Sequence, residues 1–143
     1  MTSTLRERAL RLLARSEQTR AGLAAKLARH GSEDDIAMLL GELEASGLLS
    51  DARYAEAFVA ARSTRQGAAK IRHSLRAKGI DDSVIAQHLT PDAEAEFALA
   101  RALWARKFGT PPADARDYAK QMRFLLTRGF GPDTARKILK QPD

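Results

Sequence analysis

The chain has 143 residues, of which 24 are Lys or Arg and 18 are Asp or Glu, and it contains no cysteine. A chain of this length can bury a core without a covalent staple, and the missing cysteines exclude a disulfide framework, a thiolate zinc site and a cysteine nucleophile. The net charge of +6 favours a polyanionic partner.

Apolar residues recur at helical spacing along the whole chain, as at Ile36, Leu39, Leu40 and Leu43. No clean two-residue alternation of strand length occurs, so the pattern predicts an all-α protein. Capping residues and glycines divide the pattern into nine predicted helices, at residues 4–15, 20–30, 34–46, 52–65, 68–78, 82–89, 91–108, 114–128 and 132–140.

The boundaries of three of these helices rest on local signals. Ser32 is a predicted N-cap of the third helix, and Gly47 follows its last turn. Ser50 or Asp51 can cap the fourth helix, and the run Thr90-Pro91-Asp92 predicts a cap, a first-turn proline and an acid for the seventh.

The nine helices contain a weak threefold repeat. LAAKLARHGSEDDI begins at Leu23, IRHSLRAKGIDDSV at Ile71 and QMRFLLTRGFGPDT at Gln121, which places Gly31, Gly79 and Gly129 in register. A helix that ends in glycine and is followed shortly by another helix is typical of a helix-turn-helix unit. We therefore predict three tandem three-helix repeats, at residues 1–50, 51–90 and 91–143.

Positive charge is concentrated in the middle of the chain. Residues 1–50 hold seven basic and seven acidic residues, whereas residues 62–79 hold basic residues and no Asp or Glu. We expect these cations to have no carboxylate partner within the chain and to contact phosphate groups. The predicted contact residues are Arg62, Arg65, Lys70, Arg72, Arg76 and Lys78, with Arg123 and Arg128 as second-tier candidates.

No residue pattern indicates catalysis, a metal site or a bound cofactor. The three histidines His30, His73 and His88 fall in separate predicted helices, and no phosphate-binding glycine loop occurs. The acidic run at residues 33–35 lies at a predicted helix start, where it is expected to cap the helix. Trp104 and its aromatic neighbours share one helix face, which favours a core position over stacking on bases.

Several motifs resemble those of the RecX recombination regulators. LLSDARYAEAFVAAR at residues 48–62 resembles the family's "L-x-D-x-R-aromatic-A" run with its following "F-V-x-x-R", and RQGAAKIRHSLRAKGI at residues 65–80 resembles the next motif. RGF at residues 128–130 and ALRLLARSEQTRAGLAAKL at residues 9–27 also resemble sequences of that family. The chain departs from the pattern at Ala68, where many members have proline, and at Gly22, where an acidic residue is usual.

The resemblance implies three tandem three-helix units in an elongated, curved body. It also implies a non-enzymatic modulator that binds along the RecA–DNA filament and mostly lowers the ATPase, strand-exchange and coprotease activities of RecA. Such a protein acts in DNA repair, recombination and the SOS response, and it binds single- and double-stranded DNA without sequence preference. Tyr54, Phe58 and Ile71 are then core residues, and Asp51 is a helix cap.

Two other functions remain open from the residues alone. A helix-turn-helix protein for a specific duplex site would be expected to form a symmetric dimer, but no dimer helix is evident, so we expect a monomer. A helical-repeat scaffold for an acidic protein would need no nucleic acid. Since no apolar run reaches about 18 residues and no secretory signal is evident, we expect a cytoplasmic protein without a membrane partner.

Overall fold

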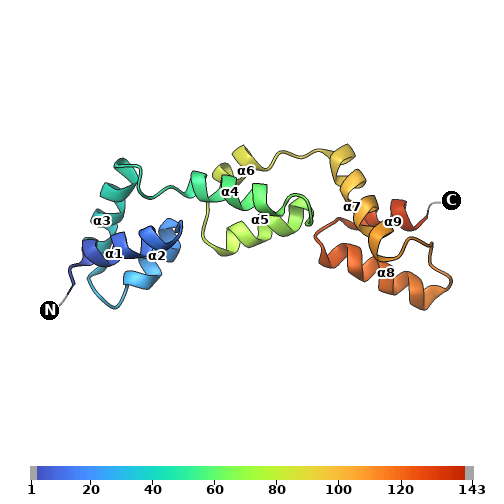
Figure 1. Cartoon of the computed structure of the whole chain (residues 1–143), viewed down its shortest axis with the longest axis horizontal. Coiled ribbons are helices and arrows are strands. Elements are labelled where there is room, and N and C mark those ends of the chain that lie inside the picture. The colour runs from blue at the N-terminus through green and yellow to red at the C-terminus, as the bar shows by residue number, and fades with distance from the viewer. Residues whose placement is uncertain (1–2, 141–143) are drawn as a thin grey trace. The chain divides into compact units, whose positions relative to one another are not determined.

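The computed structural model describes residues 3–140, which form nine α-helices and no strand (Figure 1). The helices are α1 (Leu5–Arg15), α2 (Arg20–Leu27), α3 (Glu33–Ala45), α4 (Asp51–Arg62), α5 (Ala68–Ala77), α6 (Asp82–His88), α7 (Ala93–Lys107), α8 (Ala115–Thr127) and α9 (Pro132–Leu139). The all-α prediction is confirmed. No helix in this range is both long enough and apolar enough to cross a membrane.

The chain folds as two compact units. The first unit comprises Met1–Ala57 and Leu75–His88, and the second unit comprises Phe58–Ser74 and Leu89–Asp143. The beginning of α4 therefore belongs to the first unit and its end to the second, whereas the beginning of α5 belongs to the second unit and its end to the first. The division into three sequence repeats at 1–50, 51–90 and 91–143 stays a prediction.

The core of the first unit lies among α1, α2 and α3. Each helix contributes one apolar face, and the buried side chains of Leu23, Leu27 and Leu43 are fully shielded from solvent. Burying side chains of this size stabilises the fold by about 1.5–3 kcal/mol each. The apolar residues from Ile36 to Leu43, whose spacing predicted the third helix, form the face of α3 that packs in this core.

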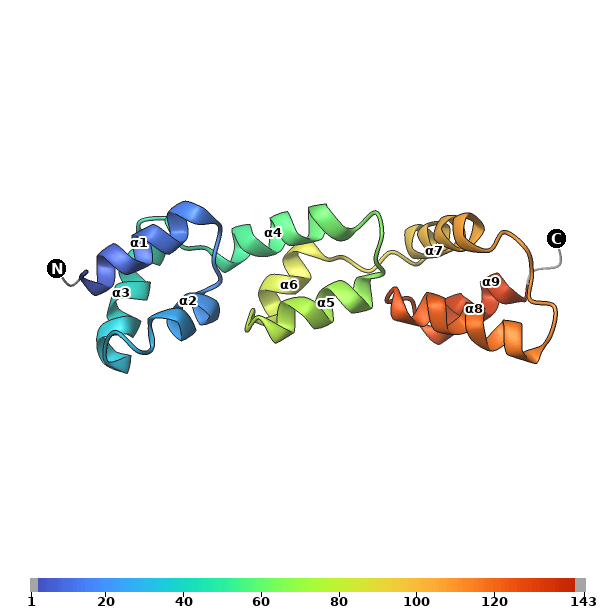
Figure 2. The ribbon, with the colours of Figure 1, turned by 60° about the horizontal axis from the view of Figure 1, so that its bottom comes forward.

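The core of the second unit lies among α7, α8 and α9, which pack on one another (Figure 2). Trp104 is 9% exposed and belongs to this core, so its predicted core position is confirmed. The Trp104 indole N–H donates to Gln121 Oε1 at 2.7 Å, which satisfies the one polar group of the buried ring.

Most helix ends follow the predicted caps. Ser32 accepts from the Asp35 N–H at 3.1 Å, and Gly47 has φ +82° after α3. Ser50, and not Asp51, caps α4 by accepting from the Arg53 N–H at 3.0 Å. The prediction for α7 is wrong in detail, because Asp92 is the N-cap and the helix begins after it.

One capping contact occurs in both units. In the first unit, Asp51 at the start of α4 accepts from the Arg20 N–H at the start of α2, at 2.8 Å. In the second unit, Glu96 near the start of α7 accepts from the Ala68 N–H at the start of α5, at 3.0 Å. In both cases a carboxylate from a later helix satisfies an N–H that has no partner within its own helix.

Candidate nucleic-acid interface

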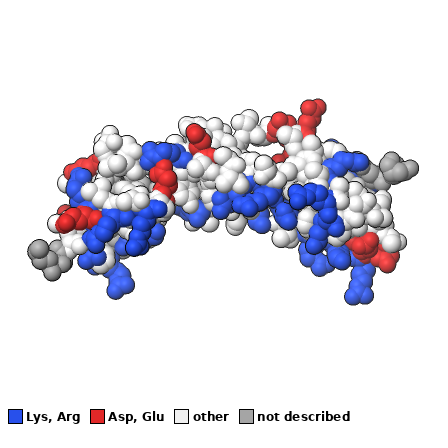
Figure 3. Space-filling view, in the orientation of Figure 1, with Lys and Arg blue, Asp and Glu red and all other residues white. Residues whose placement is uncertain are grey.

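Six of the eight predicted contact residues lie in the second unit. Arg62 is the last residue of α4, Arg65 lies in the loop that follows, and Lys70 and Arg72 lie on α5. Arg123 lies on α8, and Arg128 immediately follows that helix. In the orientation of Figure 3, Lys and Arg side chains gather over α5 and α8.

Two hydrogen bonds bring two of these residues, Arg65 and Arg128, together. The Gly67 N–H donates to the Arg128 carbonyl at 2.7 Å, and the Arg128 guanidinium donates through Nη1 to the Arg65 carbonyl at 3.1 Å. This pair of hydrogen bonds joins the α4–α5 loop to the α8–α9 turn. It also fixes Arg128, whose guanidinium carbon lies 5.0 Å from the centre of the Phe124 ring.

Two glycines make this contact possible. A Cβ atom at Gly67 would lie 2.6 Å from the carbonyl carbon of Gly129, and real Cβ atoms do not approach so closely. Gly129 has φ +97°, a conformation that residues with a side chain rarely adopt. A Cβ atom there would lie 2.9 Å from the backbone nitrogen of Lys70. The glycines therefore set the spacing between the segment that carries Arg65 and Lys70 and the α8–α9 turn that carries Arg128.

The individual cations of this set differ in their surroundings. The Arg62 guanidinium carbon lies 3.7 Å from the centre of the Phe58 ring, so the group is already stacked and half-buried. Arg65 and Arg123 are exposed and Arg72 is half-buried, and none of the three side chains has a hydrogen bond or ion pair within residues 3–140. These three groups are free to bind an external anion.

Carboxylates lie beside part of the set. Arg123 lines a hollow of about 600 Å³ together with two other cations and with Asp114 and Asp117. The carboxylate of Glu96, a residue of α7, reaches the start of α5, where its Oε1 atom accepts the Ala68 N–H. The positive character is therefore strongest around Arg65 and Arg72 and weaker around Arg123.

The other two predicted residues, Arg76 and Lys78, lie in the first unit. Arg76 Nε donates to Asp82 Oδ1 at 2.7 Å, so the expectation that no cation of this stretch has a carboxylate partner within the chain is wrong for Arg76. The turn between α5 and α6 returns Asp82 to the end of α5. Because both side chains are more than half exposed, this ion pair is weak and open to competition.

Lys78 also has a contact within the chain. Its ammonium nitrogen lies 5.9 Å from the centre of the Tyr54 ring, in a hollow of about 540 Å³ that Gly79 also lines. Gly79 has φ +83°, and a Cβ atom there would lie 2.6 Å from the Ala21 Cβ. The glycine turn thus packs on the first turn of α2, much as Gly129 packs on that of α5.

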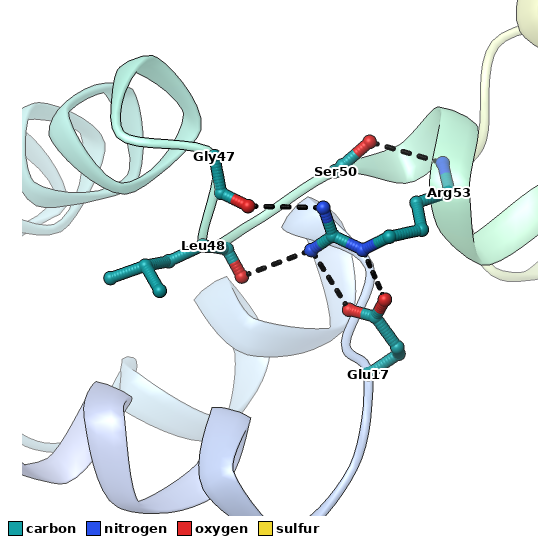
Figure 4. Close-up of polar contacts among 5 residues, drawn as sticks. All are labelled: Glu17, Gly47, Leu48, Ser50 and Arg53. Atoms are coloured by element: carbon teal, nitrogen blue, oxygen red, sulfur yellow. Dashed lines mark hydrogen bonds and ion pairs between the residues drawn. The ribbon is translucent and has the colours of Figure 1, made fainter.

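The motif at residues 48–62 has a structural role in this chain (Figure 4). The Arg53 guanidinium binds both carboxylate oxygens of Glu17 and donates to the carbonyls of Gly47 at 3.0 Å and Leu48 at 3.3 Å. The hydrogen bond with Glu17 raises the pKa of Arg53 above its ordinary value. Arg53 therefore joins the α1–α2 loop to the end of α3, and Asp51 caps α2.

The structure also shows a basic group that the sequence interpretation missed. Arg8, Arg11 and Arg15 lie on one side of α1 and line a hollow together with Lys26. The equal numbers of basic and acidic residues in the first 50 positions concealed this group. The spacing of the three arginines at i, i+3 and i+7 was the available signal.

Comparison with known proteins gives a consistent result. Residues 50–89 match the family described as RecX, second three-helix domain, and residues 94–139 match RecX, third three-helix domain. The regulatory protein RecX of Leptothrix cholodnii is 45% identical over 141 residues, which cover 98% of this chain and 90% of that protein. The protein of the same name from Chromohalobacter salexigens is 45% identical over 139 residues, which cover 96% of this chain and 91% of that protein.

Solved structures of the family have the same fold. A crystal structure of regulatory protein RecX superposes with a TM-score of 0.81 at 27% identity and covers 96% of this chain and 72% of that chain. The crystal structure of RecX from Lactobacillus salivarius gives a TM-score of 0.78 at 26% identity, with 95% of this chain and 92% of that chain covered.

Proposed function

Because this chain belongs to the RecX family of regulatory proteins, we propose that it binds the RecA–DNA filament and lowers the ATPase, strand-exchange and coprotease activities of RecA. In this proposal the protein acts as a cytoplasmic monomer and without catalysis of its own. It takes part in DNA repair and recombination by controlling how much active filament exists.

The observation that carries the proposal is the group of unpaired cations in the second unit. Arg65, Arg72 and Arg123 have no partner within residues 3–140, although the chain pairs five other arginines with carboxylates. Unpaired arginines at the surface are favourable where an external polyanion supplies the counter-charge and releases its own counterions. A nucleoprotein filament presents such a surface.

The hydrogen bonds between the α4–α5 loop and the α8–α9 turn support a rigid contact. Gly67 and Arg128 hold the Arg65 backbone in place before any partner binds. A preorganised cationic surface loses less entropy on binding than a mobile one. We propose that Arg65, Arg72 and Arg123 bind DNA phosphates or acidic side chains of the filament.

The experiment that tests this function measures ATP hydrolysis by RecA on single-stranded DNA while the protein is titrated. The proposal predicts that the rate of hydrolysis falls as the protein is added. A second titration in excess single-stranded DNA separates inhibition by binding to the filament from inhibition by binding up the free DNA. Excess DNA would relieve only the second kind of inhibition. An unchanged rate up to equimolar protein and RecA would contradict the proposal.

DNA binding by the protein alone is tested separately. If phosphates are bound, the logarithm of the affinity falls linearly with the logarithm of the salt concentration. Replacing Arg72 and Arg123 by Gln is expected to flatten that slope by about 0.7 for each lost contact to a single strand. A marked preference for one duplex sequence would instead support a stand-alone helix-turn-helix regulator.

A further inference from the structure

A concave basic site lies between α1 and α2 in the first unit, outside the residues of the proposed function. It has a volume of about 290 Å³. Arg8, Arg11 and Arg15 of α1 line one side. The floor consists of Leu12, which is half-buried, and Leu27, which is fully buried. Lys26 and His30 complete the wall.

The three arginines form a continuous row. At 1.5 Å per residue, positions 8 and 15 lie about 10 Å apart along the helix axis, and position 11 lies between them. Figure 3 shows Lys and Arg side chains gathered over α1 and α2. This arrangement matches a ligand with repeated negative charge better than one with a single charge.

The acidic residues of the same segment are engaged elsewhere. Glu42 pairs with Arg6, and Glu44 pairs with Arg20. Glu17 binds Arg53, as described above. The remaining acids are Glu7, which closes the capping box of α1, and the three acids of the first turn of α3. The hollow therefore has no carboxylate in its lining although the segment as a whole is neutral.

The cations of the hollow have few partners of their own. Arg11 Nη2 donates to Ser3 Oγ at 2.5 Å, and Lys26 Nζ donates to Gln18 Oε1 at 2.9 Å, so both bind neutral acceptors. Arg11 also contributes to the lowered pKa of Glu7, behind the larger effect of the hydrogen bonds with Thr4. Arg8 and Arg15 form no side-chain hydrogen bond or ion pair within the described part of the chain.

We propose that this hollow binds the phosphate backbone of a nucleic acid, with the sugar carbons against Leu12, which is half-buried and therefore partly accessible. Guanidinium groups match the geometry of phosphate oxygens and bind them through two parallel hydrogen bonds. The site would give the first unit a DNA contact of its own. This inference does not depend on binding to RecA.

An acidic peptide is the less favoured occupant. The walls of the hollow are mostly helical, and a helix offers no open strand edge to which an extended peptide could add. The one accessible leucine of the floor, Leu12, is also too small an apolar surface for the three or four anchor residues of an amphipathic helix. A phosphate backbone needs neither feature.

The test uses the full chain with Arg8→Gln and Arg15→Gln together, because these side chains make no contact that the fold requires. A variant with Arg101→Gln and Lys137→Gln removes the same charge from exposed positions on α7 and α9. A fluorescent single-stranded oligonucleotide is titrated at several salt concentrations. The proposal predicts that the salt slope flattens by about 1.4 in the Arg8/Arg15 variant and changes less in the control.

A second measurement locates the contact. The two methyl resonances of Leu12 are expected to shift when the oligonucleotide is added to the wild-type protein. Equal slopes for the two variants, or oligonucleotide binding that leaves these methyl resonances unmoved, would overturn the proposal. It would also be overturned if the Arg8/Arg15 variant lost binding of a polyglutamate peptide while its DNA binding stayed intact.

The outcomes for RecA and for this hollow are distinguishable. A wild-type protein that leaves RecA hydrolysis unchanged would contradict the proposed function and would not affect the oligonucleotide result. Conversely, equal salt slopes for the two variants would remove the hollow as a DNA site. The filament proposal, which rests on the second unit, would remain.

Discussion

Gly67 and Gly129 show how single residues position the candidate interface. Each lacks a Cβ atom at a place where one would collide with the backbone of the other segment or with Lys70. Their contact allows the hydrogen bond between the Gly67 N–H and the Arg128 carbonyl. Gly41 lies inside α3 and is a useful contrast, because a Cβ atom there would meet nothing within 4 Å.

This difference predicts opposite effects of one substitution. Gly67→Ala is expected to lower the free energy of unfolding by about 1–3 kcal/mol, because the new methyl group must push the two segments apart. Gly41→Ala is expected to raise it by about 0.5–1 kcal/mol, because alanine loses less backbone entropy in a helix. Urea denaturation of both variants measures the two values. A neutral Gly67→Ala would contradict the contact.

Arg53 joins three segments through one guanidinium group. Arg53→Gln is expected to lower the melting temperature, because the bidentate ion pair with Glu17 and the hydrogen bonds to the Gly47 and Leu48 carbonyls are lost together. Arg136→Gln is the matched control, since Arg136 has one exposed bond to Asp133 within its own helix, and it is expected to leave the melting temperature nearly unchanged. Equal effects of the two substitutions would refute the structural role of Arg53.

At the scale of the helices, the capping contacts connect neighbouring elements in both units. The apolar spacing, Ser32 and Gly47 were enough to predict where α3 lies, because these signals act over a few residues. The pairing of Asp51 with Arg20 could not be predicted, since it joins positions 31 residues apart. The ion pair between Asp82 and Arg76 could not be predicted either, because it depends on the path of the α5–α6 turn.

The cap on α2 is tested by Asp51→Ala. Loss of the acceptor for the Arg20 N–H is expected to cost about 1 kcal/mol of unfolding free energy and to speed hydrogen exchange at the start of α2. Asp51→Asn keeps an acceptor oxygen and is expected to retain most of the stability. Should the alanine variant exchange at the wild-type rate, the cap would have no energetic role.

For the whole molecule, the distribution of charge matters more than its total. The helices place most acids of the first 50 residues in ion pairs and helix starts, which leaves Arg8 and Arg15 unpaired. In the second unit, Arg65 and Arg72 also stay unpaired within residues 3–140, and Glu96 serves as an acceptor at the start of α5. The sequence indicated Arg65 and Arg72, because they lie in a stretch without acids. Arg8 and Arg15 were recognised only from the structure.

The most direct test of the central claim is RecA-catalysed ATP hydrolysis on single-stranded DNA with the triple variant Arg65→Gln, Arg72→Gln and Arg123→Gln. The control carries Arg101→Gln, Lys137→Gln and Lys140→Gln, which remove equal charge elsewhere on the second unit. We predict that half-maximal inhibition by the triple variant requires roughly tenfold more protein, equivalent to about 1.4 kcal/mol of binding free energy, while the control inhibits like the wild type. Identical inhibition curves for the wild type and the triple variant would contradict the claim that these unpaired cations bind the filament.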